Sequence, residues 1–125
     1  GHHSNQPAGR GRYHSVRRMI EKLLQQEREL ERAKIISETA KIPWLELQRF
    51  FASGKVIWIA GNLDLVEVAL ALQQDDVQRV GDWTANQELA AVSDDQARQW
   101  VSEDSLLWAV AIKPWVLVQE LDKEA

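Results

Sequence analysis

Residues 105–119 read SLLWAVAIKPWVLVQ, and this stretch decides the class of fold. The near-continuous apolar run over residues 105–112 predicts a buried β-strand. Lys113-Pro114 interrupts the run, because proline cannot donate a hydrogen bond to a neighbouring strand. Residues 115–119 predict a final strand or edge segment after this interruption. A small sheet is therefore expected in the C-terminal part of the chain.

Two further strands are expected upstream. Residues 55–60, KVIWIA, are rich in β-branched and aromatic side chains, which favour strands. Residues 87–92 predict another short strand. With the two C-terminal strands, these would make a small antiparallel sheet.

Residues 15–40 predict one long helix, because Glu, Leu, Gln, Arg and Lys dominate the segment. Its apolar residues form a thin stripe, which is typical of a helix that packs on a partner helix. A coiled-coil dimer is one such arrangement, although fewer than three clean heptads are present. The candidate residues for oligomerisation in this stripe are Ile20, Leu23, Leu24 and Leu30.

Four shorter helices complete the expected order. Pro43 suits the first turn of a helix over residues 43–52, and Asp64 followed by Glu67 predicts a helix that begins at residue 64. A helix is also expected to start at Asp75-Asp76. Ser93 with Gln96 predicts a capping box for a helix that ends near residue 101. The class is α+β: helix-rich, with a small antiparallel sheet, preceded by a long helix.

The domain organisation follows from length and composition. A chain of 125 residues is the size of one domain. Residues 1–14 are expected to be an affinity-tag remnant and a flexible basic tail. Residues 15–125 are expected to form a single α+β domain, with a helix over 15–40 and a body over 41–125.

Charge is distributed unevenly along the chain. Residues 1–36 hold eight basic and four acidic residues, net +4, whereas residues 37–125 hold seven basic and fifteen acidic, net −8. A basic arm is typical of nucleic-acid or membrane binding, but it can also lie against an acidic body or remain solvated. The residues of this arm are Arg10, Arg12, Arg17 and Arg18.

Several kinds of chemistry are excluded or disfavoured. The chain has no cysteine, so disulfides and thiolate metal sites are excluded. Its three histidines are His2, His3 and His14, so a Ser-His-Asp triad cannot form within residues 37–125. No phosphate-binding glycine motif and no apolar run of about 18 residues is present. We therefore expect a cytoplasmic protein without signal peptide that is not an enzyme and binds neither a cofactor nor a metal.

The tryptophans separate into two groups. The chain has six tryptophans against one tyrosine and two phenylalanines. Four fall on predicted strands or on the inner stripes of helices, and these are expected in the core: Trp58, Trp83, Trp100 and Trp108. Trp44 and Trp115 each adjoin a proline at an element boundary, so both are expected to be half exposed.

A candidate pocket combines these two tryptophans with Asp64, Glu67 and Lys113. Glu67 lies in an otherwise apolar helix, and a buried carboxylate needs a partner, for which Lys113 or Arg49 is available. Pairs of carboxylates can hold a hard cation such as Mg²⁺. They also sit where helix starts favour acids, and capping is the simpler interpretation.

Several strings of this chain resemble a small bacterial family known as domain-of-unknown-function family 2288. The resemblance covers about residues 30–120 and implies a bacterial cytoplasmic protein, without implying an activity. The basic segment before residue 30 lies outside it. The strings are residues 39–44 (TAKIPW), 46–51 (ELQRFF), 63–69 (LDLVEVA), 75–76 (DD), 95–97 (DQA) and 114–120 (PWVLVQE).

Three functions are consistent with these observations. The preferred hypothesis is a non-catalytic protein-interaction or oligomerisation module, most simply a homo-oligomer formed through the N-terminal helix. The second is a winged-helix-like regulator that binds nucleic acid through the basic arm, since the element order matches that fold. Its recognition helix at residues 75–85 would carry net charge −2, which disfavours DNA. The third is a carboxylate or metal-dependent small-molecule site around Asp64 and Glu67.

Overall fold

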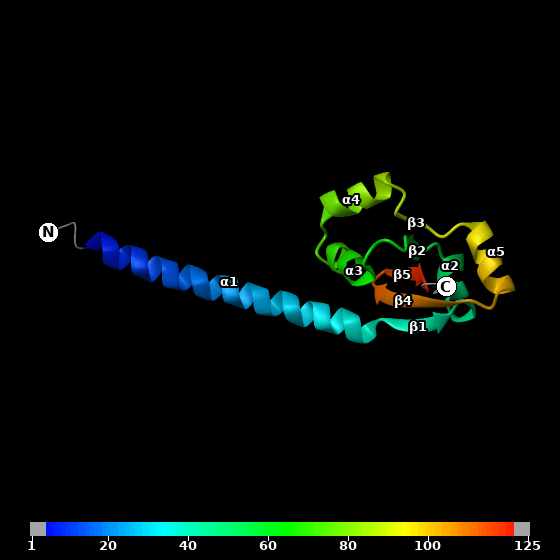
Figure 1. The fold of residues 1–125 in the computed structure, drawn as a ribbon, viewed down its shortest axis with the longest axis horizontal. Coiled ribbons are helices and arrows are strands. Elements are labelled where there is room, and N and C mark those ends of the chain that lie inside the picture. Colours follow the sequence, from blue (N-terminus) through cyan, green and yellow to red (C-terminus); the bar gives the residue numbers. More distant parts are fainter. Residues whose placement is uncertain (1–4, 122–125) are drawn as a thin grey trace. The chain divides into compact units, whose positions relative to one another are not determined.

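The computed structural model describes the backbone of residues 5–121 and the side chains of residues 14–121. Helices and strands are interspersed along the chain (Figure 1). In chain order the elements are α1 (Asn5–Glu38), β1 (Ala40–Pro43), the 3-10 helix η1 (Trp44–Leu47), α2 (Gln48–Ala52), β2 (Val56–Ile59), α3 (Leu65–Gln73), α4 (Val77–Ala85), β3 (Leu89–Ala91), α5 (Asp94–Ser102), β4 (Leu106–Ile112) and β5 (Trp115–Glu120). The α+β class is confirmed.

The chain divides into two compact units, one ending at Ala33 and one beginning at Lys34, which we call the body. The boundary falls inside α1 rather than after residue 40, because Ile35 already packs in a core cluster of the body. Helix α1 also begins at Asn5, so its backbone includes most of the segment expected to be a flexible tail. The side chains of Arg10 and Arg12 lie outside the described residues.

The body contains a five-stranded sheet in the order β1-β4-β5-β2-β3. β4 and β5 are the two C-terminal strands expected from the sequence, and they pair as a hairpin in which Ile112 faces Trp115 across the cis Lys113-Pro114 turn. The expectation of an antiparallel sheet is wrong in one respect, because β2 runs parallel to β5. The sheet is mixed, since β2 pairs in parallel with β5 while the other neighbouring strands are antiparallel.

Strand β1 is not indicated by the sequence, in which residue 40 is expected at the end of a helix and Pro43 at the start of the next one. Ala40 instead pairs with Ala109, and Ile42 pairs with Leu107. A proline restricts the residue before it to extended backbone, and here that restriction holds Ile42 in a strand. The decisive partner, β4, lies far away in sequence, so no local pattern indicated the pairing.

The strand pairing in the sheet also disagrees with the winged-helix interpretation. The order of elements from α2 onward is the one expected, but a wing requires a hairpin between the two strands that follow the recognition helix. β3 and β4 are separated by α5 along the chain, and by β5 and β2 within the sheet. Element order alone therefore suggested a likeness that the strand pairing does not support.

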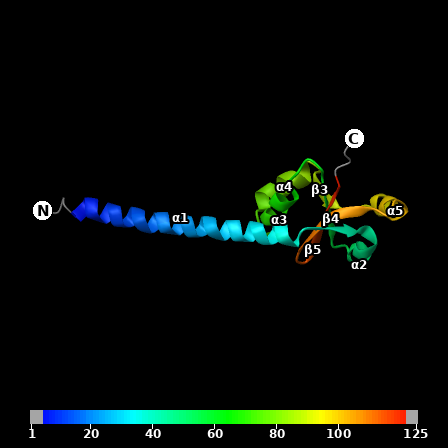
Figure 2. The same ribbon diagram turned by 60° about the horizontal axis from the view of Figure 1, so that its bottom comes forward.

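Both faces of the sheet are covered. Successive residues of a strand point to opposite faces, so Val116 and Val118 of β5 join one core cluster whereas Leu117 joins the other. Helices η1, α2 and α5 contribute to the first cluster, and α3 contributes to the second, with α4 beside it. Figure 2 shows α3 and α4 on one side of the sheet and α2 and α5 on the other.

Local capping explains where the three helices α3 to α5 begin. Asp64 accepts backbone hydrogen bonds from Val66 and Glu67, and Asp76 accepts one from Arg79. Ser93 forms the predicted capping box with Gln96. Each cap satisfies amide groups that the first helical turn leaves without a partner.

The four helices α2 to α5 end in the same way. After each cap a residue adopts positive φ, and the amide that follows it bonds back to a carbonyl in the last turn, as Ser105 N does to Trp100 O. Only the first of the four residues is a glycine, which adopts this backbone conformation without steric cost. These residues are Gly54 (φ 72°), Asp75 (57°), Gln87 (61°) and Asp104 (50°).

Candidate functional site

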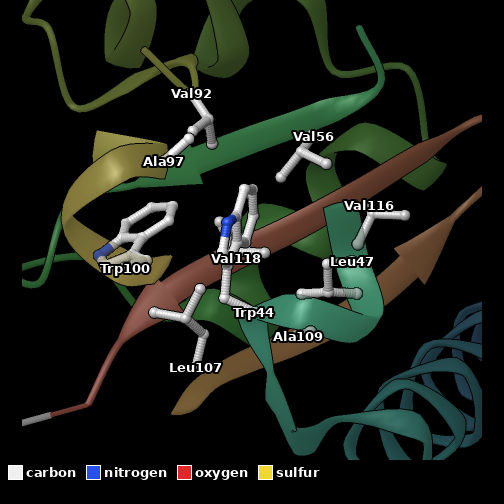
Figure 3. Close-up of a cluster of buried hydrophobic side chains, with 10 residues drawn as sticks. All are labelled: Trp44, Leu47, Val56, Val92, Ala97, Trp100, Leu107, Ala109, Val116 and Val118. Carbon is white, nitrogen blue, oxygen red and sulfur yellow. The ribbon is translucent and has the colours of Figure 1, made fainter. Parts of the chain in front are cut away.

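Trp44 lies in the core of the body, so the expectation that it is half exposed is wrong. Its side chain is only 1% exposed and contacts Trp100 and Phe51, with ring centroids 5.0 Å and 5.5 Å away. Figure 3 shows the two tryptophans side by side, one from η1 and the other from α5. Pro43, the residue before Trp44, is the last residue of β1.

The other tryptophans follow the expectation more closely. Trp100 is fully buried, and Trp58, Trp83 and Trp108 are partly buried and packed against the two core clusters. Trp115 is 38% exposed at the start of β5. Of the two tryptophans that the sequence singled out, Trp115 alone is accessible to a ligand or partner.

Trp115 and Lys113 line an apolar groove of about 620 Å³ in the body. Its walls come from η1, α2 and the β4–β5 hairpin, and Lys55 and Glu38 place charges along it. A groove of this kind can receive an apolar side chain from a partner. The apolar lining includes Ile42, Leu47, Phe50, Trp115 and Val116.

Asp64 and Glu67 lie elsewhere. Asp64 caps α3 and borders a separate, smaller cavity with Thr39, Trp108 and Gln119. Glu67 is partly exposed, and its carboxylate lies 3.6 Å from the guanidinium of Arg79 on α4. The five residues of the candidate pocket are therefore divided among a core cluster, an apolar groove and a capped helix start.

The carboxylates do not gather for metal binding in the part of the chain that the structure describes. No three His, Cys, Asp or Glu side chains lie together there in a way that could hold an ion. The helix expected to bind DNA, α4, also has little positive charge for contacts with phosphates, because Arg79 is its only basic residue. Its guanidinium stacks 4.9 Å from the ring of Trp83 and pairs with Glu67.

Helix α1 presents an apolar face, which we define as Val16, Met19, Ile20, Leu23, Leu24 and Leu30. At 3.6 residues per turn these positions fall on one side of the helix. All six side chains are exposed, from 47% for Leu24 to 72% for Leu30. Such a row of large apolar side chains in water is characteristic of an interaction surface.

The basic arm is only partly described. Arg17 lies 3.9 Å from Glu21 one turn along α1, and both side chains are about two-thirds exposed. Arg18 is exposed as well. Acidic residues are interspersed with the basic ones along the described part of α1. Among the described residues, no helix is long and apolar enough to cross a membrane.

The chain thus has a mixed five-stranded sheet covered on both faces, and a long helix with an exposed apolar face. Residues 30–120 match a family described as protein of unknown function (DUF2288). The chain belongs to this family, as its sequence resemblance predicted. Five of the six residues of the apolar face lie before residue 30, outside the matched range.

A solved structure has the same fold. The NMR solution structure of PA1075 from Pseudomonas aeruginosa is 44% identical in sequence and superposes with a TM-score of 0.68. The match covers 77% of this chain and 89% of that one. No curated protein matches the chain.

Proposed function

We propose that this protein is a protein-interaction module that self-associates through the apolar face of α1. The observation that carries the proposal is the exposure of six large apolar side chains on one side of a helix. Soluble proteins seldom leave a contiguous apolar surface in water unless a partner covers it. The body would serve as a folded scaffold, and its apolar groove beside Trp115 offers a second, smaller contact surface.

The energetics of burial support this proposal. Fully burying one Val, Leu, Ile or Met side chain contributes about 1.5–3 kcal/mol. A micromolar dissociation constant corresponds to about 8 kcal/mol. Two apolar faces of six residues carry more apolar surface than this affinity needs, which leaves room for the entropic cost of association.

Light scattering coupled to size exclusion tests the proposal. At tens of micromolar the full chain should have about twice its mass of 14.3 kDa. Ile20→Lys should return it to a monomer, because the substitution places a charge in the centre of the apolar face. Deleting residues 1–30 should have the same effect.

Ile36 supplies a matched control on the same helix. Ile20 and Ile36 are each 52% exposed, but Ile36 falls on the other side of α1 by the helical repeat. Ile36→Lys should therefore leave the dimer intact. A monomeric wild-type protein at these concentrations, or equal disruption by both lysine variants, would refute the proposal.

A further inference from the structure

We propose that two copies of α1 pair antiparallel, with Leu24 of each copy packed against Leu24 of the other. This inference rests on the proposed self-association and specifies its geometry. It follows from the charges that flank the apolar face, which fit one helix direction and conflict with the other. Every residue used below lies between residues 16 and 33 of α1.

The apolar face has the spacing of a short coiled-coil seam. Val16, Leu23 and Leu30 recur every seven residues and occupy position d of a heptad. Ile20 and Glu27 then occupy position a, so one carboxylate lies within the seam. The positions beside the seam are e (Arg17, Leu24 and Glu31) and g (Met19, Gln26 and Ala33).

A parallel pair would bring like residues together. Glu27 would face Glu27 of the second copy inside the seam, where two carboxylates repel each other. In that direction position e faces position g, so Glu31 would meet Gln26 and Leu24 would meet Met19. Within the described residues, the parallel arrangement therefore has a charge conflict and no flanking ion pair.

The antiparallel pair removes the conflict. Ile20 packs against Leu30 of the second copy, and Glu27 lies beside Leu23 instead of another carboxylate. Position e now faces position e, so Arg17 meets Glu31 of the second copy, and symmetry repeats this ion pair at the other end. Leu24 meets itself at the centre, between the two ion pairs.

In the single chain, Arg17 makes an ion pair that it can give up in order to bind Glu31 of the second copy. Its present contact with Glu21 is long, at 3.9 Å, and highly exposed. Such i,i+4 ion pairs on a helix surface contribute little to stability. Arg17 can therefore turn from Glu21 to Glu31 of the second copy at little cost.

Charge reversal tests the pairing of Arg17 with Glu31. Arg17→Glu should raise the dimer dissociation constant about tenfold, because two attractive contacts become repulsive. Adding Glu31→Arg to the same chain should bring the dissociation constant back to within about threefold of the wild-type value, since opposite charges again face each other across the pair. Arg18→Glu makes the same change of charge away from the seam and should have little effect.

The absence of native cysteine permits a second test by disulfide trapping. Leu24→Cys should oxidise readily to a covalent dimer, and a mixture of Arg17→Cys with Glu31→Cys chains should give the mixed disulfide. If Met19→Cys with Leu24→Cys gives the mixed disulfide instead, the helices are parallel. That result would overturn this inference and leave the proposed self-association standing, whereas a monomeric wild-type protein would overturn both.

Discussion

Trp44 and Trp100 meet edge to face in the core, with ring centroids 5.0 Å apart and an angle of 63° between their planes. The contact joins η1 to α5 over one face of the sheet, although the two residues are far apart in sequence. Pairs with this geometry contribute about 0.5–1.5 kcal/mol beyond the burial of their surfaces. The two rings thus hold together the elements that cover this face.

Replacing either ring should strongly destabilise the body. Trp44→Ala and Trp100→Ala should each lower the free energy of unfolding by about 3–5 kcal/mol, because each leaves a large cavity. Trp115→Ala, at a site 38% exposed, should cost under about 1 kcal/mol. Urea unfolding measures all three. If Trp115→Ala were as costly as Trp44→Ala, the core would not be centred on Trp44.

The contribution of the capping box at the start of α5 to the free energy of unfolding should be measurable with a single substitution. Ser93 Oγ accepts a hydrogen bond from the Gln96 amide at 3.1 Å, and the Gln96 side chain accepts one from the Ser93 amide at 3.0 Å. Ser93→Ala should therefore lower the free energy of unfolding by about 1 kcal/mol. Ser102→Ala, in the exposed last position of the same helix, is the matched control. Equal losses in the two variants would argue against the cap.

Gln119 ties the last strand to the loop that follows β2. Its amide Nε2 donates to the carbonyl oxygens of Ala60 and Leu63, each at 2.8 Å. Gln119→Leu removes both hydrogen bonds, although the Ala60 carbonyl keeps the one it accepts from the Leu63 amide. The loss of two hydrogen bonds should cost about 1–3 kcal/mol.

Hydrogen exchange should locate this effect. Amides of residues 60–64 should exchange faster in Gln119→Leu, because the loop loses its attachment to β5. Gln78→Leu makes the same change on the exposed surface of α4 and should leave the loop unaffected. Unchanged protection in Gln119→Leu would show that other contacts fix the loop.

The end of α4 offers a stabilising substitution. Gln87 has φ 61°, a conformation that costs a residue with a side chain about 1–2 kcal/mol. Gln87→Gly removes this strain, and the greater entropy of glycine in the unfolded chain offsets about 0.5–1 kcal/mol of the gain. The free energy of unfolding should rise by about 0.5 kcal/mol. Gln87→Ala retains the strain and should give no increase; if it stabilises as much as Gln87→Gly, strain is not the cause.

The predicted helices α3, α4 and α5 are confirmed to within a residue or two. Asp64, Asp76 and Ser93 each cap the helix that their spacing indicated. The strands β4 and β5 are also confirmed, because the apolar runs on either side of Lys113-Pro114 indicate them locally. In each case the decisive contacts join residues within about one helical turn or one hairpin.

The candidate site was less predictable. The structure separates the five residues chosen for it: Trp44 packs against Trp100, Glu67 pairs with Arg79, and Lys113 and Trp115 line the groove. The sequence does not predict the groove beside Trp115, because the walls of this groove come from η1, α2 and the β4–β5 hairpin. No spacing along the chain brings these segments together. The apolar residues of α1, by contrast, were identifiable from their helical repeat alone.

The sequence by itself determined the class of fold, the starts of helices α3 to α5, the strands β4 and β5, and the apolar face of α1. These depend on caps, turns and side-chain periodicity, which act between near neighbours in the chain. Only the tertiary structure decided that β1 is a strand, that β2 lies parallel to β5, and that Trp44 is buried while Trp115 is exposed. Strand pairing and burial are set by contacts between distant segments, and the energy of those contacts appears only once the sheet has brought them together.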